Sequence, residues 1–453
     1  MPFTRRQFLG TTANAAMAAG LMTRSSVFGA NDRIGVCCVG VHGRGGNHIR
    51  NFLTGGDSDV VALCDVDRNV LEARANQIQE HTGKRPKTYT DMREAFADPG
   101  VDVASIATPN HWHTLAAMWA IEAGKDVYVE KPLSHNVWEG RQLARLAAKS
   151  DRIVQHGTQN RSIPSWQWAI QRMRDGIIGD IFLARALCYK ERDDIGRGEE
   201  VTAPEFLDYS LWQGPRPERP YLRRKPGTGN PDRHAIDDGV GGLFIHYNWH
   251  WFWDYGNGDI GNQGVHQMDV ATWALDKGLP CTVYSAGGRY GYEDDGETPN
   301  TMSTTFTYDD GTTLEFAVRG RATNAEGPVT IGNLFYGSGG WGYIAEWKVG
   351  FYDQGGKLIE EVPEFPAPEE GRPDIQYARF LQAVRSRDKG DIPATAEQGH
   401  ISSAHCHLAN ISYRLGRSLT FDPGQETFVG DTEADALLKD EYRPGFDVPV
   451  VEA

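Results

Sequence analysis

The sequence has too few cysteines for a disulfide-stapled protein, with six in 453 residues. No two of them have the C-x-x-C spacing of a zinc or redox motif. Cys37, Cys38 and Cys64 lie in apolar stretches that are typical of buried strands. The triplet 405–407 (His-Cys-His) holds three potential ligands, but adjacent helical residues point in different directions. We therefore expect neither a disulfide framework nor a metal site.

The sequence also lacks a long apolar run and an excess of positive charge. Because no stretch of about 20 apolar residues is present, we expect no membrane span in the mature chain. Acidic residues outnumber basic ones by 61 to 46, and the formal net charge of −15 repels phosphate backbones. We therefore expect no nucleic-acid partner. Aromatic residues reach 10%, which is enough for a sizeable core and argues against extensive disorder.

The N-terminus has the pattern of an export signal. Arg5-Arg6 precedes Phe8-Leu9, and a weakly apolar stretch rich in Ala and Gly runs from Gly10 to Met22. This order is typical of a twin-arginine signal, which exports folded proteins, often with a cofactor inside. We expect residues 1–30 to be this signal peptide and the mature protein to be periplasmic. A chance basic pair at an amphipathic N-terminus is the alternative.

Residues 31–157 alternate short apolar stretches with helical ones. Nearly continuous apolar strands separated by helices indicate a doubly wound parallel sheet, as in a Rossmann domain. The expected strands are Arg33–Val39, Asp59–Cys64, Val101–Ala107, Asp126–Val129 and Ile153–Gly157. The expected helices are Val70–His81, Asp91–Ala97, Thr114–Ala123 and Trp138–Lys149.

Residues 158–423 have a different pattern and are predicted to form a second α/β domain, followed by a C-terminal tail at 424–453. The Pro- and Gly-rich stretch 190–242 is predicted to be a loop. The expected strands, mainly antiparallel, are Ile181–Tyr189, Thr282–Tyr290, Thr301–Tyr308, Thr312–Val318 and Val329–Tyr336. The expected helices are Ser165–Asp175, Gly264–Asp276, Asp374–Arg387 and Ala394–Leu415.

A glycine-rich turn follows the first expected strand. In the pattern G-x-G-x-x-G, the first and third glycines are Gly40 and Gly45, and His42 replaces the middle one. Asp65 follows Gly45 by 20 residues, at the end of the second strand, where a carboxylate accepts the ribose hydroxyls of NAD and repels the 2′-phosphate of NADP. The pattern predicts NAD binding; a tight turn and a helix N-cap are the alternatives. The turn residues assigned to the cofactor are Gly40, His42, Gly43, Arg44 and Gly45.

Polar motifs follow the next strands, where ligands bind in doubly wound sheets. Glu130-Lys131-Pro132 follows the expected strand Asp126–Val129, and Lys131 is suited to hold a substrate hydroxyl. A surface turn ended by the proline is the alternative. Asn160 and Arg161 come just after the expected strand Ile153–Gly157, where the two domains meet. The residues assigned to the cofactor in these motifs are Thr108, Pro109, Asn110, His113, Glu130, Lys131 and Asn160.

An aromatic segment, Phe244–Tyr255, has seven aromatic residues and two histidines in twelve positions. Aromatic faces stack on sugar rings, while Asn, His and Asp bind the hydroxyls. A buried core or an oligomer contact is the alternative for these rings. The residues assigned to the substrate are Arg161, His246, Trp249 and Asp259.

Together these motifs resemble the glucose-fructose oxidoreductase / inositol dehydrogenase / rhizopine catabolism family of NAD(P)-dependent oxidoreductases. The similarity extends through Glu130–Pro132 to the motif Gly261–Asp269, which reads Gly-Asn-Gln-Gly-Val-His-Gln-Met-Asp. It implies a Rossmann domain followed by an α/β domain with a large open, mainly antiparallel sheet. It also implies a homodimer or homotetramer that associates through this sheet.

The resemblance implies that Lys131 and His266 flank the nicotinamide and the substrate. Asn262 stands where the family usually has Asp, and an amide cannot stabilise a protonated His266 as a carboxylate would. Asp259 and Asp269 are the carboxylates nearby. The predicted catalytic residues are Lys131, His266 and Asn262.

Three functions are consistent with these residues. The first is a sugar or polyol dehydrogenase with a tightly held cofactor, since free NAD is scarce outside the cytoplasm. The second is redox-neutral cleavage of a glycoside through transient oxidation, as in some relatives of this superfamily. The third is a binding protein that retains the fold.

Overall fold

The computed structural model describes residues 33–229, 242–345, 348–366 and 371–452. All elements reported below belong to one compact unit that begins at Ile34. The expected export signal lies outside the described residues, so it stays a prediction. Within the described part of the chain, no helix is both long and apolar enough to cross a bilayer.

The first sheet has six parallel strands in the order β3-β2-β1-β4-β5-β6. This confirms the predicted Rossmann sheet. The strand with the sequence Lys-Thr-Tyr was missed, because it is short and its side chains are largely exposed. The strands are β1 (Ile34–Val39), β2 (Ser58–Cys64), β3 (Lys87–Tyr89), β4 (Val103–Ile106), β5 (Asp126–Val129) and β6 (Val154–His156).

Helices cover both faces of this sheet. One core cluster joins it to α3, α4 and α5, and another joins it to α1, α2 and α9. The last of these, α9 (Ile375–Ser386), comes from the far end of the chain and packs Tyr377 and Phe380 against Phe52 of α1. The other helices are α1 (Arg44–Leu53), α2 (Arg68–Thr82), α3 (Met92–Ala97), α4 (Asn110–Glu122) and α5 (Val137–Lys149).

The second sheet has nine strands in the order β15-β14-β13-β7-β12-β11-β10-β16-β17. Only β7 and β12 pair in parallel, so the expected large, mainly antiparallel sheet is confirmed. The strands β14 and β15 at one edge of this sheet, and β16 and β17 at the other edge, were not predicted. The strands are β7 (Ile181–Cys188), β10 (Thr282–Gly288), β11 (Thr301–Thr307), β12 (Thr313–Arg319), β13 (Ile331–Gly337), β14 (Gly340–Ala345), β15 (Lys348–Asp353), β16 (Leu419–Asp422) and β17 (Thr427–Phe428).

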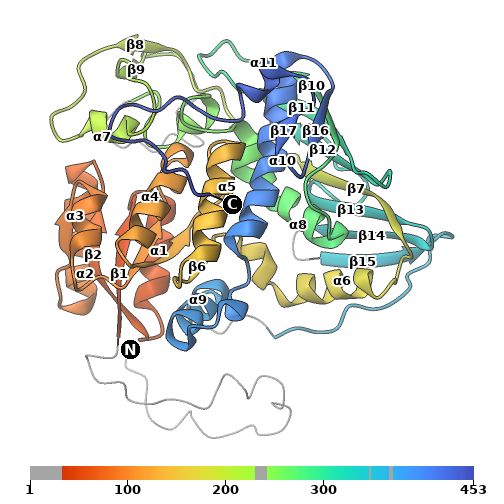
Figure 1. Ribbon diagram of the computed structural model, residues 1–453, viewed down its shortest axis with the longest axis horizontal. Helices are drawn as coiled ribbons and strands as arrows, with labels where there is room; N and C mark the ends of the chain where they lie inside the picture. The colour runs from red at the N-terminus through yellow and green to blue at the C-terminus, as the bar shows by residue number, and fades with distance from the viewer. Residues whose placement is uncertain (1–32, 230–241, 346–347, 367–370, 453) are drawn as a thin grey trace, which may run out of the picture. The chain divides into compact units, whose positions relative to one another are not determined.

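Three helices pack on the second sheet: α6 (Pro164–Arg174), α8 (Val265–Leu275) and α10 (Ala396–Leu415). The helix α10 also packs on α5, so it connects the two sheets (Figure 1). Its N-terminus has a capping box, in which Thr395 and Gln398 satisfy each other's main-chain N–H groups. A short π-helical turn, η4 (Ile260–Gly264), leads directly into α8.

The stretch 190–242, of which residues 230–241 lie outside the described part, contains more structure than the predicted loop. It has the short elements β8 (Gly198–Glu200), α7 (Tyr209–Gln213) and β9 (Leu222–Arg224). These elements were not predicted because the stretch is rich in proline. The prolines lie between the elements and not within them. Several side chains join the aromatic segment in one hydrophobic cluster, which we call the roof cluster. Its buried members are Ile195, Leu207, Trp212, Tyr221, Leu243, Phe244, Ile245, Trp249, Trp251, Phe252 and Tyr255.

The predicted tail, 424–453, packs on the body of the protein where it is described. It contains α11 (Thr432–Asp435), and Val448 is buried in the core of the first sheet. Together with α9, this residue shows that the C-terminal region completes the Rossmann core. The boundaries at 157 and 423 stay predictions.

Candidate functional site

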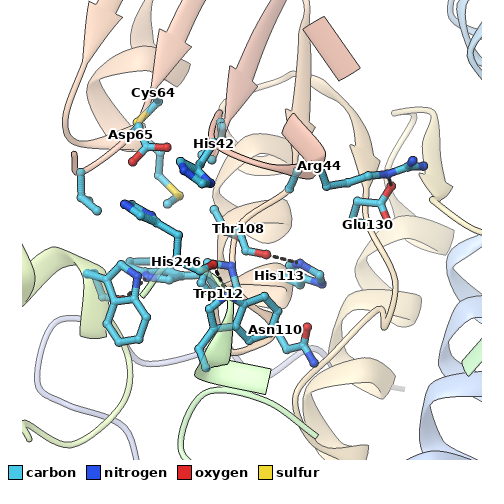
Figure 2. A pocket seen from close by; sticks show the side chains of 18 of the residues that line it. His42, Arg44, Cys64, Asp65, Thr108, Asn110, Trp112, His113, Glu130 and His246 are labelled. Carbon is cyan, nitrogen blue, oxygen red and sulfur yellow. Dashed lines mark hydrogen bonds and ion pairs between the residues drawn. The ribbon is translucent and has the colours of Figure 1, made fainter. Parts of the chain in front are cut away.

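A cavity of about 380 Å³ lies at the carboxyl ends of the parallel strands (Figure 2). One wall comes from the turns after β1, β2, β4 and β5, which carry Gly40, Asp65, Thr108 and Lys131. The opposite wall comes from the second part of the chain. Its residues are Leu211, Trp212, His246, Tyr247, Trp249, His250 and Asn262.

The glycine turn has the shape that a dinucleotide phosphate requires. A Cβ atom on Gly45 would lie 1.9 Å from the carbonyl oxygen of Gly40, so this glycine allows close packing of α1 on the turn. Gly40 has a φ of 75°, which only glycine adopts easily. Gly43 faces open space, and no side chain caps the N-terminus of α1. The uncapped N–H groups of this helix therefore suit the pyrophosphate of NAD.

Asp65 ties the glycine turn to the end of β2. Its carboxylate accepts hydrogen bonds from the main-chain N–H groups of Val41, at 2.8 Å, and Asp67, at 3.0 Å. Burial raises the pKa of Asp65, and these two donors oppose the shift. The carboxylate lines the cavity at the position expected for the ribose hydroxyls of NAD.

The glycine turn is also held by Arg74, whose role was not predicted. Arg74 of α2 donates from Nε to the carbonyl oxygen of Val41, at 3.0 Å, and from Nη2 to that of His42, at 2.8 Å. Both acceptors lie in the turn, so one guanidinium fixes its path. A single arginine in a predicted helix gives no sign of this role.

His42 does not fill the phosphate site with its side chain. Its ring stacks on that of His246, with centroids 4.3 Å apart and planes 8° from parallel (Figure 2). Burial, together with His246 and Arg74, lowers the pKa of His42 to about 4, so the ring is neutral near pH 7. The missing middle glycine is therefore compatible with the site.

Lys131 marks the other end of the cavity. Its Nζ donates a 2.8 Å hydrogen bond to the main-chain carbonyl of Asn262, across the two parts of the chain. Burial lowers its pKa to about 8, although the carboxylate of Glu130 opposes the shift. An amine with this pKa is suited to exchange protons near neutral pH.

Glu130 holds the cations around this end in place. Arg44 Nε donates to its carboxylate at 2.7 Å, and His48 Nε2 lies 3.0 Å from the same oxygen. Burial alone would raise the pKa of Glu130, but these partners keep it well below its ordinary value. His48 was not predicted, because in the sequence it looks like an ordinary polar residue of α1.

His266 lies behind the cavity wall and is not one of its lining residues. It is buried, and its Nδ1 has no hydrogen-bond partner within the described part of the chain. Burial and the nearby Lys131 ammonium hold the pKa of His266 well below its ordinary value, so the ring is neutral. The side chain of Asn262 does not replace the usual carboxylate, because its Nδ2 points to the hydroxyl of Tyr247, 3.4 Å away.

Tyr247 is a wall residue that the sequence analysis placed only within the aromatic segment. Its hydroxyl oxygen accepts from Arg192 Nη1 at 3.0 Å and from Asn262 Nδ2 at 3.4 Å. Arg192 is itself fixed by Asp259, 2.6 Å away, in a buried ion pair. Asp259, predicted to bind substrate, thus holds the arginine behind Tyr247 and does not line the cavity.

The structure separates the remaining predicted residues into two groups. Thr108, Pro109, Asn110, His113 and Trp249 line the cavity. His113 connects the turns after β4 and β5, because its ring nitrogens lie 2.6 Å from the carbonyl oxygen of Pro132 and 2.8 Å from that of Thr108. The second group, Asn160 and Arg161, is buried in η2 (Gln159–Ser162) away from the wall. Arg161, predicted to bind the substrate, pairs with Asp269 at 2.9 Å and does not line the cavity.

No group of side chains in the described ranges has the arrangement of a metal site. The ring of His405 lies 2.9 Å from the hydroxyl of Tyr308, and His407 Nε2 lies 3.2 Å from Ser134 Oγ. The histidines of this triplet are therefore occupied in separate contacts inside the core.

Comparison with known families agrees with this geometry. Residues 33–158 match the oxidoreductase family described as an NAD-binding Rossmann fold, GFO_IDH_MocA. Residues 195–448 match the C-terminal alpha/beta domain of the same family. The chain belongs to the Gfo/Idh/MocA oxidoreductase family. The first sheet is thus the NAD-binding Rossmann fold of this family, and the cofactor prediction is confirmed.

Curated relatives match only part of the chain. Inositol 2-dehydrogenase 1 of Saccharopolyspora erythraea is 34% identical over 158 residues, which cover 34% of this chain and 45% of the relative. A glycosyl hydrolase family 109 protein of Shewanella pealeana is 30% identical over 139 residues, 30% of each chain. Less than half the length of these relatives is therefore matched.

Solved structures share the fold over a larger part of the chain. The WlbA dehydrogenase of Bordetella pertussis, in complex with NADH and UDP-GlcNAcA, has a TM-score of 0.61 at 17% identity. The match covers 86% of this chain and 99% of that one. The aldose-aldose oxidoreductase of Caulobacter crescentus has a TM-score of 0.59 at 16% identity, with 86% and 100% covered. At this identity the likeness shows the fold alone.

Proposed function

We propose that this protein is an exported, NAD-dependent oxidoreductase that acts on a sugar, a sugar derivative or a cyclic polyol and retains its cofactor between turnovers. The observation that carries the proposal is that one cavity extends from Asp65 to Lys131. One end has the carboxylate and glycine turn that suit an adenosine ribose and pyrophosphate. The other has an amine with a pKa of about 8.

Each end has a separate task. Asp65 and the N-terminus of α1 bind and orient the cofactor. Bound NAD supplies a hydride acceptor. Lys131 holds the reacting oxygen and exchanges its proton, and the hydroxyl of Tyr247 positions the same substrate group from the opposite wall. His266 is neutral and does not line the cavity, so we assign it no direct contact with the substrate.

Two observations support a carbohydrate as substrate. The aromatic faces of Trp249 and His250 line the cavity beside the polar groups of Tyr247 and Lys131. In addition, the relative named inositol 2-dehydrogenase and the relatives named glycosyl hydrolase family 109 act, by their names, on polyols or glycosides. The glycosyl hydrolase family 109 relatives support a second candidate function, the redox-neutral cleavage of a glycoside.

Retention of the cofactor is supported by the fact that the two walls of the cavity come from different parts of the chain. The second part forms the wall opposite the glycine turn, and Trp212 and Trp249 of the roof cluster belong to this wall. Export through the twin-arginine pathway, proposed from residues 1–30, would deliver the folded protein with NAD already enclosed.

The second sheet supports association into a homodimer or homotetramer. Two of its strands carry large side chains that are exposed in the single chain, Phe182 of β7 and Tyr284 of β10. Light scattering of the purified protein would test this, and a monomer at all concentrations would contradict it.

The first experiment is to denature the protein, purified after export through its own leader, and to measure released nucleotides by mass spectrometry. We expect about one NAD(H) per chain. Next, the intact protein is incubated with myo-inositol, D-glucose or p-nitrophenyl glycosides, without added acceptor. Absorbance at 340 nm from bound NADH supports the dehydrogenase, whereas released p-nitrophenol without net NADH supports the second candidate. A protein that neither contains nor binds NAD(H) contradicts both.

A further inference from the structure

The roof cluster is fastened to the Rossmann sheet by main-chain hydrogen bonds at the end of β2. Arg68 N–H donates to the carbonyl of Phe206 at 3.0 Å, and Asp208 N–H donates to that of Val66 at 2.9 Å. These bonds join the segment around α7 to the strand end that carries Asp65. The roof is therefore positioned next to the ribose end of the cavity by the backbone itself.

A second fastening lies at the start of α4. The indole Nε1 of Trp112 donates to the carbonyl of Leu211 at 3.1 Å, and His111 Nε2 lies 3.0 Å from the carbonyl of Trp212. Both tryptophans line the cavity, together with Leu211. The segment around α7 thus contacts the Rossmann domain at the end of β2 and at the start of α4. The glycine turn after β1 lies between these two contacts, because β1 lies between β2 and β4 in the sheet.

At the glycine turn, side chains connect the aromatic segment to the Rossmann domain. His246 of this segment stacks on His42, and its Nε2 lies 3.1 Å from Asp67 Oδ2. The side chains of His246 and Asp67 are only 8% and 2% exposed. Asp67 also caps α2, because it accepts from the main-chain N–H of Asn69 at 2.8 Å, and this fixes its carboxylate. We call the set His42, His246 and Asp67 the latch.

The latch lies on the wall of the cofactor cavity, since both of its imidazoles are lining residues. His42 occupies the middle position of the glycine pattern, where the cofactor pyrophosphate approaches the backbone. His246 comes from the opposite wall. A dinucleotide in this cavity therefore has the latch beside its pyrophosphate and adenosine ribose.

We propose that the latch is a nucleotide-retention site: His246, anchored by Asp67 and stacked on His42, keeps the roof closed over the adenosine half of NAD and slows its release. His246, which the sequence assigned to the substrate, thereby belongs to the cofactor. The inference rests on the proposed function and specifies how the cofactor is retained. It also gives His42 a role that glycine could not perform, because glycine has no ring to stack.

The test measures release of NADH directly and needs no sugar. The mature protein is loaded with NADH, excess NAD is added, and loss of NADH fluorescence gives the dissociation rate. We expect His246→Ala and His42→Gly to release NADH at least tenfold faster than wild type, which corresponds to about 1.4 kcal/mol. The substitution His246→Phe, which keeps a stacking ring but loses the bond to Asp67, should give an intermediate rate.

His81→Ala is the matched control, because His81 is an exposed histidine of α2 far from the cavity wall. It should release NADH at the wild-type rate. Should His246→Ala fail to fold, as judged by circular dichroism, His246→Gln replaces it. Release from the latch variants within twofold of wild type overturns the latch but leaves the proposed function standing. A wild-type protein that does not bind NADH overturns both.

Discussion

At the scale of single residues, Lys131 is the group on which the proposed chemistry depends most. Burial leaves its amine with a pKa of about 8, well below the ordinary value for lysine. We expect Lys131→Met to lower kcat/KM for oxidation by about 10³-fold, since a positioned acid–base group contributes roughly 10²–10⁴. Bound NAD(H) should stay near one per chain. Loss of nucleotide from this variant would show a role in folding or cofactor binding instead.

The same pKa predicts a pH dependence. The neutral amine accepts the proton of the substrate hydroxyl, and its fraction rises as the pH passes through about 8. We therefore expect kcat/KM for oxidation to rise with pH and to level off above this value, while reduction, which needs the ammonium, falls over the same interval. A profile of oxidation that is flat between pH 6 and 9 would contradict the assignment of Lys131 as the proton acceptor.

Tyr247 gives a second test on the opposite wall. Two donors, from Arg192 and Asn262, hold its hydroxyl oxygen in place. We expect Tyr247→Phe to reduce kcat about 10–100-fold with a smaller change in NADH affinity, because the substrate loses a hydrogen-bond partner while Asp65 and the glycine turn are unchanged. Tyr209→Phe is the control: it removes a hydroxyl from the same region of the fold but outside the cavity lining. Equal losses in both variants would indicate a structural effect.

At the scale of elements, the turn between β1 and α1 offers a matched pair of glycines. A Cβ on Gly45 would meet the carbonyl oxygen of Gly40 at 1.9 Å, whereas one on Gly43 meets nothing within 4 Å. We expect Gly45→Ala to lower both the melting temperature and NADH affinity. Gly43→Ala should melt like wild type yet bind NADH at least tenfold more weakly, because its methyl group projects toward the anion at the uncapped end of α1. Unchanged affinity in Gly43→Ala would place the pyrophosphate elsewhere.

The elements also show what a sequence can and cannot predict. Strands such as β5 follow from local apolarity, and its bounds were predicted without error. The strand β3 was missed because three polar residues at a sheet edge have no such pattern. Asp259 was assigned to the substrate because its partner, Arg192, lies 67 residues earlier, and no local pattern reveals a buried pair of that separation.

The residues of the site also divide into those that could be predicted from the sequence and those that could not. The glycine turn, Asp65 and Lys131 could be assigned because each lies at a strand end, and the topology of a parallel sheet brings strand ends together. Tyr247, Arg74 and Asp67 could not, because their positions depend on how segments far apart in the sequence pack. Arg161, adjacent to a strand end, was placed at the site but instead forms an internal ion pair with Asp269.

At the scale of the whole molecule, the C-terminal region is part of the NAD-binding core. Phe380 of α9 is fully buried and contacts Phe52 and Tyr128, on the face of the first sheet that α1 and α2 also cover. We expect Phe380→Ala to destabilise the protein by about 3–5 kcal/mol, the usual effect of removing a large buried ring. The measurement is chemical denaturation followed separately by tryptophan fluorescence and by loss of bound NADH.

Because α9 fills the core of a sheet formed by residues more than 200 positions away, both signals should be lost in one transition at the same denaturant concentration. The fragment 31–157, expressed alone, should for the same reason expose Phe52 and Tyr128 and bind no NADH. An independently folded fragment that binds NADH would show that α9 only covers a finished domain. The full chain would then have two folding units, and the two signals in Phe380→Ala would separate.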